Sequence, residues 1–371
     1  IGGLYLTTVM SQQEGQANSL DIDAGAETTN FEFKPTDYDV NTHFFLAYYF
    51  RNRWEDALAD PPTIRVANGF QGIQEIEVWK LEPTTLDEDN VRQAVAVVDL
   101  AESPVLVSEA DNFVVAELPS NGIDQYDDIT GGNTDQFMRN GEVSPTGYLE
   151  DQLQLSTSDY QIGKYRKLQL GRDYEIDEIL GYISLRQRLQ DNEALAVAYR
   201  FRANGQTYQV GDFSIEGGGS QGSQTEDRLV LKLIKPINLR QPAIESGFNP
   251  AAWYLQLRNI YRFPGRGLNP NEFDLQVYYE PSGKPPSKTL PDVGGRSTLL
   301  QMLGLDRLNE NDQPTPDDLF DYIASTVDPG EGLLKFPYLE PFGSRLRDII
   351  ASEQSDNQDE LIETYVFSEL Y

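Results

Sequence analysis

Oxygen-bearing side chains gather in the stretch 305–321, which reads LDRLNENDQPTPDDLFD. Ca²⁺ binds about six to eight such oxygens, and the backbone carbonyls of a loop can complete its shell. The alternative is that the same oxygens form Asx turns and helix caps around Pro314 and Pro316. The stretch is not an EF-hand, because it lacks the mid-loop glycine and the bidentate glutamate. The candidate calcium ligands are Asp306, Asn309, Asn311, Asp312, Asp317, Asp318 and Asp321.

Acidic residues elsewhere offer further candidates. The loop 124–135 is a second place where hard oxygen ligands gather among glycines. A glycosidase needs two carboxyl groups at a set separation across a cleft, and the closely spaced pairs are Glu75 with Glu77 and Asp173 with Glu175. In a chain with 60 acidic residues such pairs arise by chance, and both are expected at strand edges. We therefore assign no catalytic residue and expect that the chain is not an enzyme.

The composition excludes several classes of function. The chain has no cysteine, so it cannot form a disulfide, a thiolate metal site or a thiol nucleophile. His43 is the only histidine, which argues against the usual zinc sites, and its place beside Phe44 favours a packing or capping role. The 60 acidic and 29 basic residues leave a formal charge of -31. This charge repels nucleic acid and favours basic partners and divalent cations, so no nucleic-acid partner is expected.

Aromatic and basic residues follow one another near the end of a predicted helix. Asn249 is a suitable N-cap, Pro250 suits the first helical position, and Gly265 suits the C-terminal end. Tyr and Arg are the residue types that most often anchor a protein partner, whereas aromatic residues in general also fill cores. The predicted partner-binding residues are Tyr261, Arg262, Phe263 and Arg266. For the two aromatic residues, a place in the core is the alternative.

Most of the predicted elements are strands. The segment 181–213 contains two alternating runs separated by Asn204-Gly205, and this dipeptide is typical of a type I′ β-hairpin. Helices are predicted at 44–58, 250–263 and 297–303. Further strands are predicted at 4–10, 73–80, 94–100, 112–117, 165–170, 181–185, 273–279 and 363–371. The pattern predicts an α+β fold, mainly antiparallel β in sandwich-like lobes, with a few covering helices.

The linker-like composition of one segment suggests a division of the chain. Residues 217–227 are rich in Gly and Ser and are predicted to be a loop. Residues 1–216 would form a strand-rich lobe with one aromatic helix and the long acidic loop, and residues 228–371 a C-terminal α+β lobe. The chain contains no long apolar span, so we expect a soluble region without a membrane span of its own. The opening Ile1-Gly2-Gly3 is interpreted as the start of a piece of a larger protein.

Eight segments carry a resemblance to a known family, in order along nearly the whole chain: 31–58, 75–80, 94–100, 181–213, 228–236, 251–263, 303–322 and 334–346. None of them is a short generic motif, and the departures fall mostly in the acidic loops. These segments resemble the SprA family of outer-membrane translocon proteins, which belong to the type 9 secretion system and the gliding-motility machinery.

The resemblance implies a role in protein export across the outer membrane. The chain would be a non-enzymatic insertion that acts as a cap, a gate support or a docking surface. Its partners would be the rest of the parent barrel, other outer-membrane proteins of the secretion system and exported cargo. Long insertions favour the extracellular face, with the periplasmic face as the alternative. A secreted carbohydrate-binding or carbohydrate-active module is the rival from another class.

Overall fold

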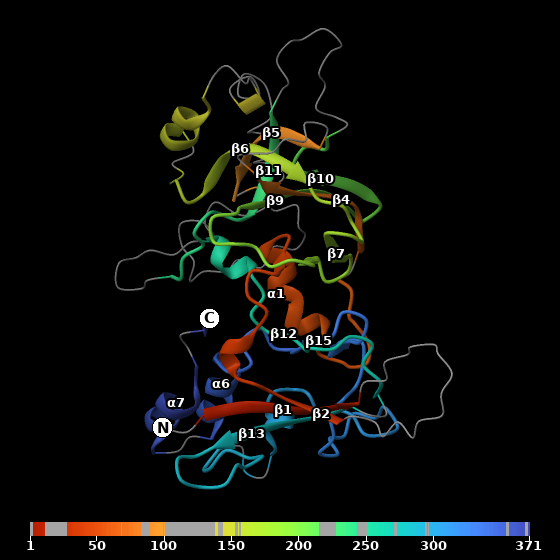
Figure 1. Ribbon diagram of the computed structural model, residues 1–371, viewed down its shortest axis with the longest axis vertical. Helices are drawn as coiled ribbons and strands as arrows, with labels where there is room; N and C mark the ends of the chain where they lie inside the picture. The colour runs from red at the N-terminus through yellow and green to blue at the C-terminus, as the bar shows by residue number, and fades with distance from the viewer. Residues whose placement is uncertain are drawn as a thin grey trace, which may run out of the picture. The chain divides into compact units, whose positions relative to one another are not determined.

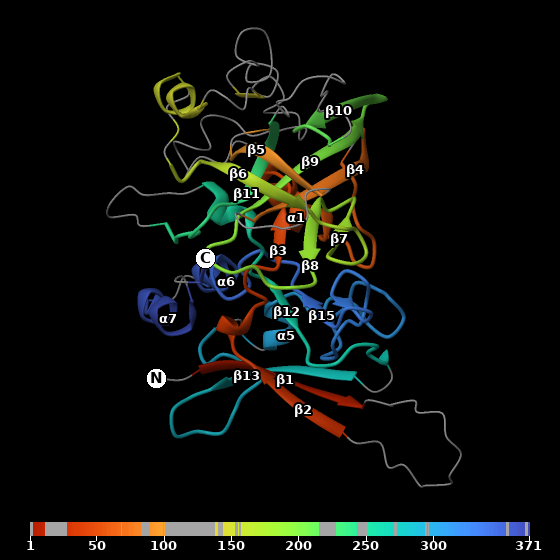
Figure 2. The same cartoon turned by 45° about the horizontal axis from the view of Figure 1, so that its top comes forward.

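The computed structural model describes residues 3–11, 28–67, 69–82, 90–98, 100, 138–139, 144–152, 155, 157–214, 228–242, 251–270, 273–293, 295, 297–353, 356–367 and 370–371. The chain forms two compact units: unit 1 contains residues 1–40, 54–65 and 258–371, and unit 2 contains residues 41–53 and 66–257. Figures 1 and 2 show the elements of both. The predicted strand 112–117, the acidic loop 124–135, the loop 217–227 and the cap residues Asn249 and Pro250 lie outside the described residues.

Unit 2 is built on a six-stranded sheet in the order β10-β9-β11-β5-β6-β4 (Figure 1). β4 also pairs with β9 along most of its length, so five of the strands form a closed ring and β10 lies outside it. All pairs are antiparallel except β11 with β5. The strands are β4 (Phe70–Leu81), β5 (Val91–Val97), β6 (Tyr160–Lys167), β9 (Leu195–Ala203), β10 (Gln206–Val210) and β11 (Leu229–Lys235).

The predicted hairpin is confirmed as β9 and β10. Asn204 and Gly205 have φ of 52° and 78°, the left-handed values that a type I′ turn requires. The register places Tyr208 opposite Phe201, and their rings stack with centroids 5.1 Å apart. Alternating apolar residues of this kind pack on one face of a sheet, which fixes the register.

A second, three-stranded sheet of unit 2 has the order β3-β8-β7, with β3 (His43–Phe45), β7 (Tyr174–Asp177) and β8 (Tyr182–Leu185). The helix predicted at 44–58 is therefore shorter: α1 (Tyr48–Ala57) begins after β3, because Phe44 and Phe45 pair with β8 instead. The chain passes from unit 2 into unit 1 within α1. A one-turn π-helix occupies Tyr148–Gln152.

Unit 1 contains two three-stranded sheets. In the first, β1 (Gly3–Ser11) lies between β2 (Thr28–Phe33) and β13 (Phe273–Glu280) and is antiparallel to both (Figure 2). In the second, β15 (Leu333–Lys335) lies between β12 (Ile260–Arg262) and β14 (Val327–Asp328). A 3₁₀ turn occupies Pro35–Asp37, and the helices of this unit beyond α1 are α5 (Leu299–Met302), α6 (Ser344–Ser352) and α7 (Gln358–Tyr365).

One apolar core joins these elements of unit 1. It combines the inward faces of β1 and β13 with residues of α5, α6 and α7. Edge-to-face aromatic pairs run through it, such as Tyr261 with Phe336 at 5.4 Å between centroids. Its members include Leu4, Leu6, Tyr261, Phe263, Leu275, Val277, Leu299, Phe336, Phe342, Leu346, Ile350, Leu361 and Tyr365.

The structure confirms the fold class, α+β with mainly antiparallel sheet, and corrects two elements. Instead of a helix over 250–263, a 3₁₀ turn (Ala251–Leu255) is followed by β12, which pairs with β15. Pro264 disfavours helical geometry at the preceding residue, and pairing with β15 supplies the backbone hydrogen bonds. The strand predicted at 363–371 is also wrong, since α7 covers its first part and buries Leu361 and Tyr365, four residues apart, on one face.

The division of the chain also differs from the prediction. β9 and β11 lie on either side of the predicted boundary at 217–227, yet they pair in one sheet. Unit 1 instead combines the two ends of the chain, because β1 pairs with β13 from Gly3 opposite Glu280 to Met10 opposite Phe273. A sheet can join strands of any sequence separation, so loop composition alone did not locate the boundary.

Candidate functional site

A pocket of about 190 Å³ opens in unit 2 among the ends of three strands and the loop 186–193. Three largely buried leucines form the apolar part of its lining, called the leucine floor: Leu168, Leu185 and Leu189. Its charged lining is unusual for so acidic a chain, because five basic residues face two acidic ones, Asp173 and Glu193. The basic residues are Lys80, Arg166, Arg172, Arg186 and Arg188.

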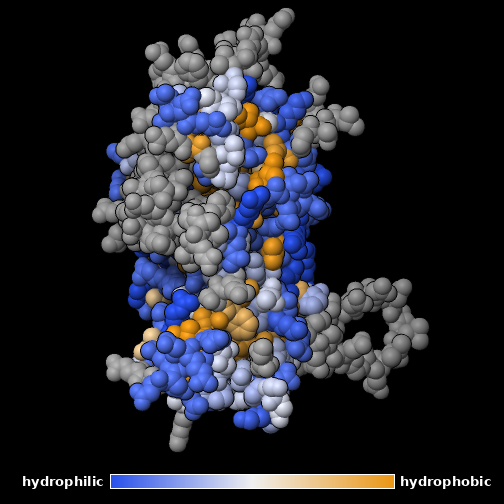
Figure 3. All heavy atoms as spheres, turned by 90° about the vertical axis from the view of Figure 1, so that its left-hand side faces the viewer, coloured by the Kyte–Doolittle hydropathy of each residue, from blue (hydrophilic) through white to orange (hydrophobic). Residues whose placement is uncertain are grey.

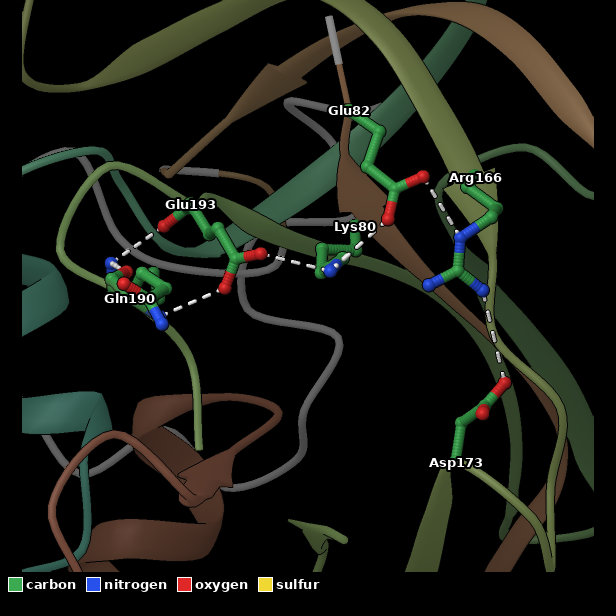
Figure 4. Close-up of polar contacts among 7 residues, drawn as sticks. Lys80, Glu82, Arg166, Asp173, Gln190 and Glu193 are labelled. Atoms are coloured by element: carbon green, nitrogen blue, oxygen red, sulfur yellow. Dashed lines mark hydrogen bonds and ion pairs between the residues drawn. The ribbon is translucent and has the colours of Figure 1, made fainter. Parts of the chain in front are cut away.

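A continuous chain of ion pairs crosses one side of the pocket (Figure 4). Lys80 Nζ lies 2.9 Å from a carboxylate oxygen of Glu193 and 3.1 Å from one of Glu82. The other oxygen of Glu82 accepts a hydrogen bond from Arg166 Nε at 3.0 Å, and Arg166 Nη1 lies 3.9 Å from a carboxylate oxygen of Asp173. The pairing of β4 with β6 places Lys80 directly opposite Arg166, so the strand register assembles this chain.

The pKa values within this chain favour the charged forms. Burial alone would raise the pKa of Glu82, but hydrogen bonds from Arg166 and Lys80 outweigh it and lower the pKa. The pKa of Glu193 is lowered in the same way, by Lys80 and the backbone N–H of Gln190 against the effect of burial. Burial would lower the pKa of Lys80, but its two carboxylate partners raise it. The three groups therefore stay ionised around neutral pH.

The loop 186–193 is held in place from beneath. The N–H of Leu189 donates to the carbonyl of Asn41 at 3.1 Å, and the Asn41 side chain donates back to the Leu189 carbonyl at 3.4 Å. The Lys235 ammonium donates to the carbonyls of Gln190 at 3.1 Å, Asp191 at 3.2 Å and Glu193 at 2.6 Å. Burial lowers the pKa of Lys235 to about 8, although the nearby carboxylates of Asp191 and Glu193 oppose this. The rim of the pocket is therefore rigidly built.

Two cations of the lining stand apart from these pairs. The Arg172 side chain is 75% exposed, with Gln169 Oε1 at 3.3 Å and Asp173 at 4.0 Å as its neighbours. Arg188 is exposed and makes no hydrogen bond or ion pair with any residue that the structure describes. Guanidinium groups that are not occupied by protein carboxylates can bind the oxygens of an anion. The pocket is therefore chemically suited to an anionic group with an apolar stem.

The acidic stretch 305–321 forms turns and caps. The buried Asp306 carboxylate accepts the backbone N–H groups of Asp317 at 3.0 Å and Asp318 at 2.9 Å, and also a side-chain N–H of Gln301. Asp321 accepts the N–H of Arg307 at 2.6 Å. Burial raises the pKa of Asp306, although these hydrogen bonds oppose it. These contacts match the turn-and-cap alternative.

The seven predicted calcium ligands are not gathered around one point. Asn309 Oδ1 accepts the N–H groups of Asn311 at 2.9 Å and Gln313 at 3.1 Å, as an Asx turn does. Across the described ranges of the chain, no group of three or more His, Asp or Glu side chains is arranged to hold a metal ion. The geometry therefore gives the calcium prediction no support.

The predicted partner anchor is divided between core and surface. Tyr261 and Phe263 are buried, and the Tyr261 hydroxyl donates to the carbonyl of Pro35 at 2.7 Å. Arg262 donates to Asp39 at 2.9 Å. Of the four, only Arg266 is mostly exposed, because 61% of its side chain is accessible to solvent. Its guanidinium lies 3.6 Å from the carboxylate of Glu331. The geometry favours the core alternative for both aromatic residues.

The carboxylate pairs and the histidine that sequence reasoning considered for catalysis have structural contacts. Glu77 is buried and accepts hydrogen bonds from Lys167 at 2.5 Å and from the hydroxyl of Ser214 at 2.7 Å. Glu75 pairs with Arg200 at 2.6 Å, and Glu175 pairs with Arg186 at 2.6 Å. The fully buried His43 shares a hydrogen bond of 2.8 Å between Nδ1 and Ser184 Oγ, as a packing role predicts.

Sequence reasoning missed the pocket. Its residues come from positions 80, 166 to 173 and 185 to 193, and only the tertiary structure brings them together, for example by pairing β4 with β6. The one local signal was the run Arg186-Gln187-Arg188 directly after β8, which places two cations in a loop of an otherwise acidic chain.

No known protein-family model matches the chain, and a search of curated proteins found no relative. In the part of the chain that the structure describes, no helix combines the length and the apolar character needed to cross a membrane.

Proposed function

We propose that this chain is a non-enzymatic region of a SprA-like outer-membrane translocon, where it serves protein export as a docking surface, gate support or cap. The observation that carries the proposal is the resemblance of eight segments, in order, to that family. The proposal is supported by the structure in one respect, because several of these segments form strands that pair with one another.

The pairing is clearest in unit 2. The segments 75–80 and 94–100 supply about half of β4 and of β5, the segment 228–236 supplies all of β11, and the segment 181–213 supplies β9 and β10. All five strands belong to one sheet although more than a hundred positions separate the first from the last. Unit 1 shows the same pattern, because the segment 251–263 contributes β12 and the segment 334–346 contributes two of the three residues of β15, which pairs with β12. Resemblance that falls on mutually paired strands supports a shared fold better than scattered matches would.

A binding role is supported over a catalytic one by the state of the carboxylates. Glu75, Glu77 and Glu175 are each engaged by a basic side chain, so they are occupied as structural partners. A general acid or base must instead reach a substrate from an open position.

The surface chemistry supports a role in contact with passing or docked proteins. Hydrophilic residues cover most of the coloured surface on the face shown in Figure 3. With a formal charge of -31, the chain attracts basic partners and repels acidic ones. We place the domain on the extracellular face, where such translocons carry their long insertions.

The test is the accessibility of this region in intact cells that carry the parent protein. The exposed turn around Gly283 suits an epitope tag, because a Cβ at Gly283 would meet nothing within 4 Å. We expect antibody labelling of the tag without permeabilisation, with a tagged periplasmic protein as the unlabelled control. Labelling only after the outer membrane is opened would support the periplasmic alternative.

A second measurement addresses export itself. Deleting the region from the parent protein is expected to reduce the amount of cargo in the medium while the parent still reaches the outer membrane. Normal export from such cells would count against any role in the translocon.

A further inference from the structure

We propose that the pocket of unit 2 binds the carboxylate of a polypeptide, either an acidic side chain or a chain end. This inference rests on the pocket alone and holds whether or not the chain belongs to a translocon. The binding groups would be the guanidiniums of Arg172 and Arg188, assisted by Arg166, above the leucine floor.

The charge balance of the lining leaves room for one anion. Lys80, Arg166 and Arg186 are matched by the carboxylates of Glu82, Glu193, Asp173 and Glu175. Asp173 is shared, because Arg166 and Arg172 approach it only at 3.9 Å and 4.0 Å. Among the described residues, the five cations thus exceed the four carboxylates by one, and the excess is in the exposed Arg172 and Arg188.

The strongly acidic remainder of the chain does not cancel this local charge. At physiological ionic strength the Debye length is about 8 Å, so exposed charges farther away are largely screened. The groups lining the pocket therefore dominate the potential inside it. A ligand carboxylate would replace water around Arg172 and Arg188 without breaking the pairs of Lys80 and Glu82.

The size and floor of the pocket favour a carboxylate on an aliphatic stem. A volume of about 190 Å³ is smaller than the roughly 300–1,000 Å³ that drug-sized ligands occupy, so a single side chain or chain end fits it best. Leu168, Leu185 and Leu189 offer apolar contact to such a stem. A free phosphate would gain nothing from these leucines, which is why we favour the carboxylate.

The pocket is preorganised, which lowers the cost of binding. Lys235 and Asn41 hold the loop 186–193 through backbone carbonyls and N–H groups. Glu193 both accepts the N–H of Gln190 at 2.8 Å and pairs with Lys80. Little further ordering of the rim is therefore needed when a ligand arrives.

The experiment uses the whole purified chain and ligand-observed saturation-transfer NMR, which detects weak binding to a large protein. The probes are acetyl-Gly-Leu-Glu-amide for a side-chain carboxylate and acetyl-Gly-Leu-Ala with a free carboxyl end for a chain terminus. Acetyl-Gly-Leu-Gln-amide is the uncharged control. We expect saturable binding of at least one acidic probe, in the millimolar range, and none of the control.

Variants assign the binding to the pocket. In R172Q/R188Q we expect at least tenfold weaker binding, because each lost guanidinium removes a charge-assisted hydrogen bond. The matched control is R202Q, which removes an exposed arginine of β9 outside the pocket lining and should leave binding unchanged. Should the double variant fail to fold, R188Q alone serves, since the Arg188 side chain has no partner among the described residues.

Four results would overturn the proposal. They are an absence of saturable binding by both acidic probes, equal binding to R172Q/R188Q and the wild-type chain, and a loss of binding in R202Q equal to that in the double variant. The fourth comes from a competition titration, in which inorganic phosphate would displace the bound probe at a tenth of the concentration at which sodium acetate displaces it. The last result would identify a phosphate site instead.

Discussion

Lys80 on β4 lies directly opposite Arg166 on β6, so two cations face each other across a strand pair. Like charges in this position destabilise a sheet. Glu82 resolves the conflict, because one of its oxygens lies 3.1 Å from Lys80 Nζ and the other 3.0 Å from Arg166 Nε. Glu82 is therefore the group on which this side of the pocket depends.

Replacing Glu82 with Gln is expected to destabilise the chain by about 1–3 kcal/mol, because it leaves two partly buried cations facing each other with one carboxylate fewer. Urea denaturation of the variant and the wild-type chain measures the difference. Glu178→Gln is the matched control, since Glu178 is exposed and its side chain forms no ion pair with the described residues. Equal stabilities of E82Q and E178Q would contradict the importance of Glu82.

The lowered pKa of Lys235 predicts a pH dependence of stability. Its pKa is about 8 in the folded chain and near its ordinary value of 10.5 when unfolded, so the unfolded state binds the proton more tightly. The free energy of unfolding should therefore increase as the pH rises from 8 to 10, by up to about 3 kcal/mol. This gain in stability is lost again as the pH falls through 8. Lys235→Met should lack this rise, and chemical denaturation at pH 7 to 9.5 measures it.

The stabilities of the wild-type chain and K235M should be compared only below pH 10. Burial raises the pKa of Tyr174 in the folded chain, so ionisation of this residue in the unfolded state favours unfolding in more alkaline solution. A parallel pH dependence of the wild-type chain and K235M between pH 8 and 9.5 would show that Lys235 keeps its ordinary pKa in the folded chain.

Gly181 is expected to tolerate no side chain. Its φ is 65°, and an added Cβ would overlap the ring of Phe50. Gly181→Ala should therefore cost more than about 3 kcal/mol, from backbone strain together with overpacking. Gly171→Ala is the matched control, because Gly171 also has a positive φ, 79°, but open space around it, and should cost about 1 kcal/mol. Similar melting temperatures for the two variants would show that the Phe50 ring does not hinder a side chain at position 181.

The contacts of Asp306 predict how the chain responds to a chelator. Its oxygens already accept hydrogen bonds from Gln301, Asp317 and Asp318, so EDTA should leave the melting temperature unchanged. Asp306→Ala should destabilise the chain by about 2–4 kcal/mol by leaving these donors unpaired. Thermal melts with EDTA and with added CaCl₂ measure the first effect, and a fall of the melting temperature on chelation would restore the calcium interpretation.

Local patterns in the sequence determined several elements by themselves. Asn204-Gly205 specified its turn because few residues adopt a left-handed φ without strain, and the hairpin formed as predicted. Thr298 and Gln301 form the capping box at the start of α5, inside the helix predicted at 297–303. The strand predicted at 73–80 lies within β4. In the first two cases the deciding interaction joins residues close in sequence, so the sequence alone reveals it.

Only the tertiary structure decided the rest. Residues 260–262 carry an apolar spacing compatible with a helix, and pairing with β15 more than seventy positions later made them a strand. The pairing of β1 with β13, and the closure of the ring by β4 and β9, depend on contacts that no local pattern encodes. The pocket follows from the same cause, because the cross-strand neighbours Lys80 and Arg166 are 86 positions apart. Strand pairing and burial act through space, and local propensity is too weak to oppose them.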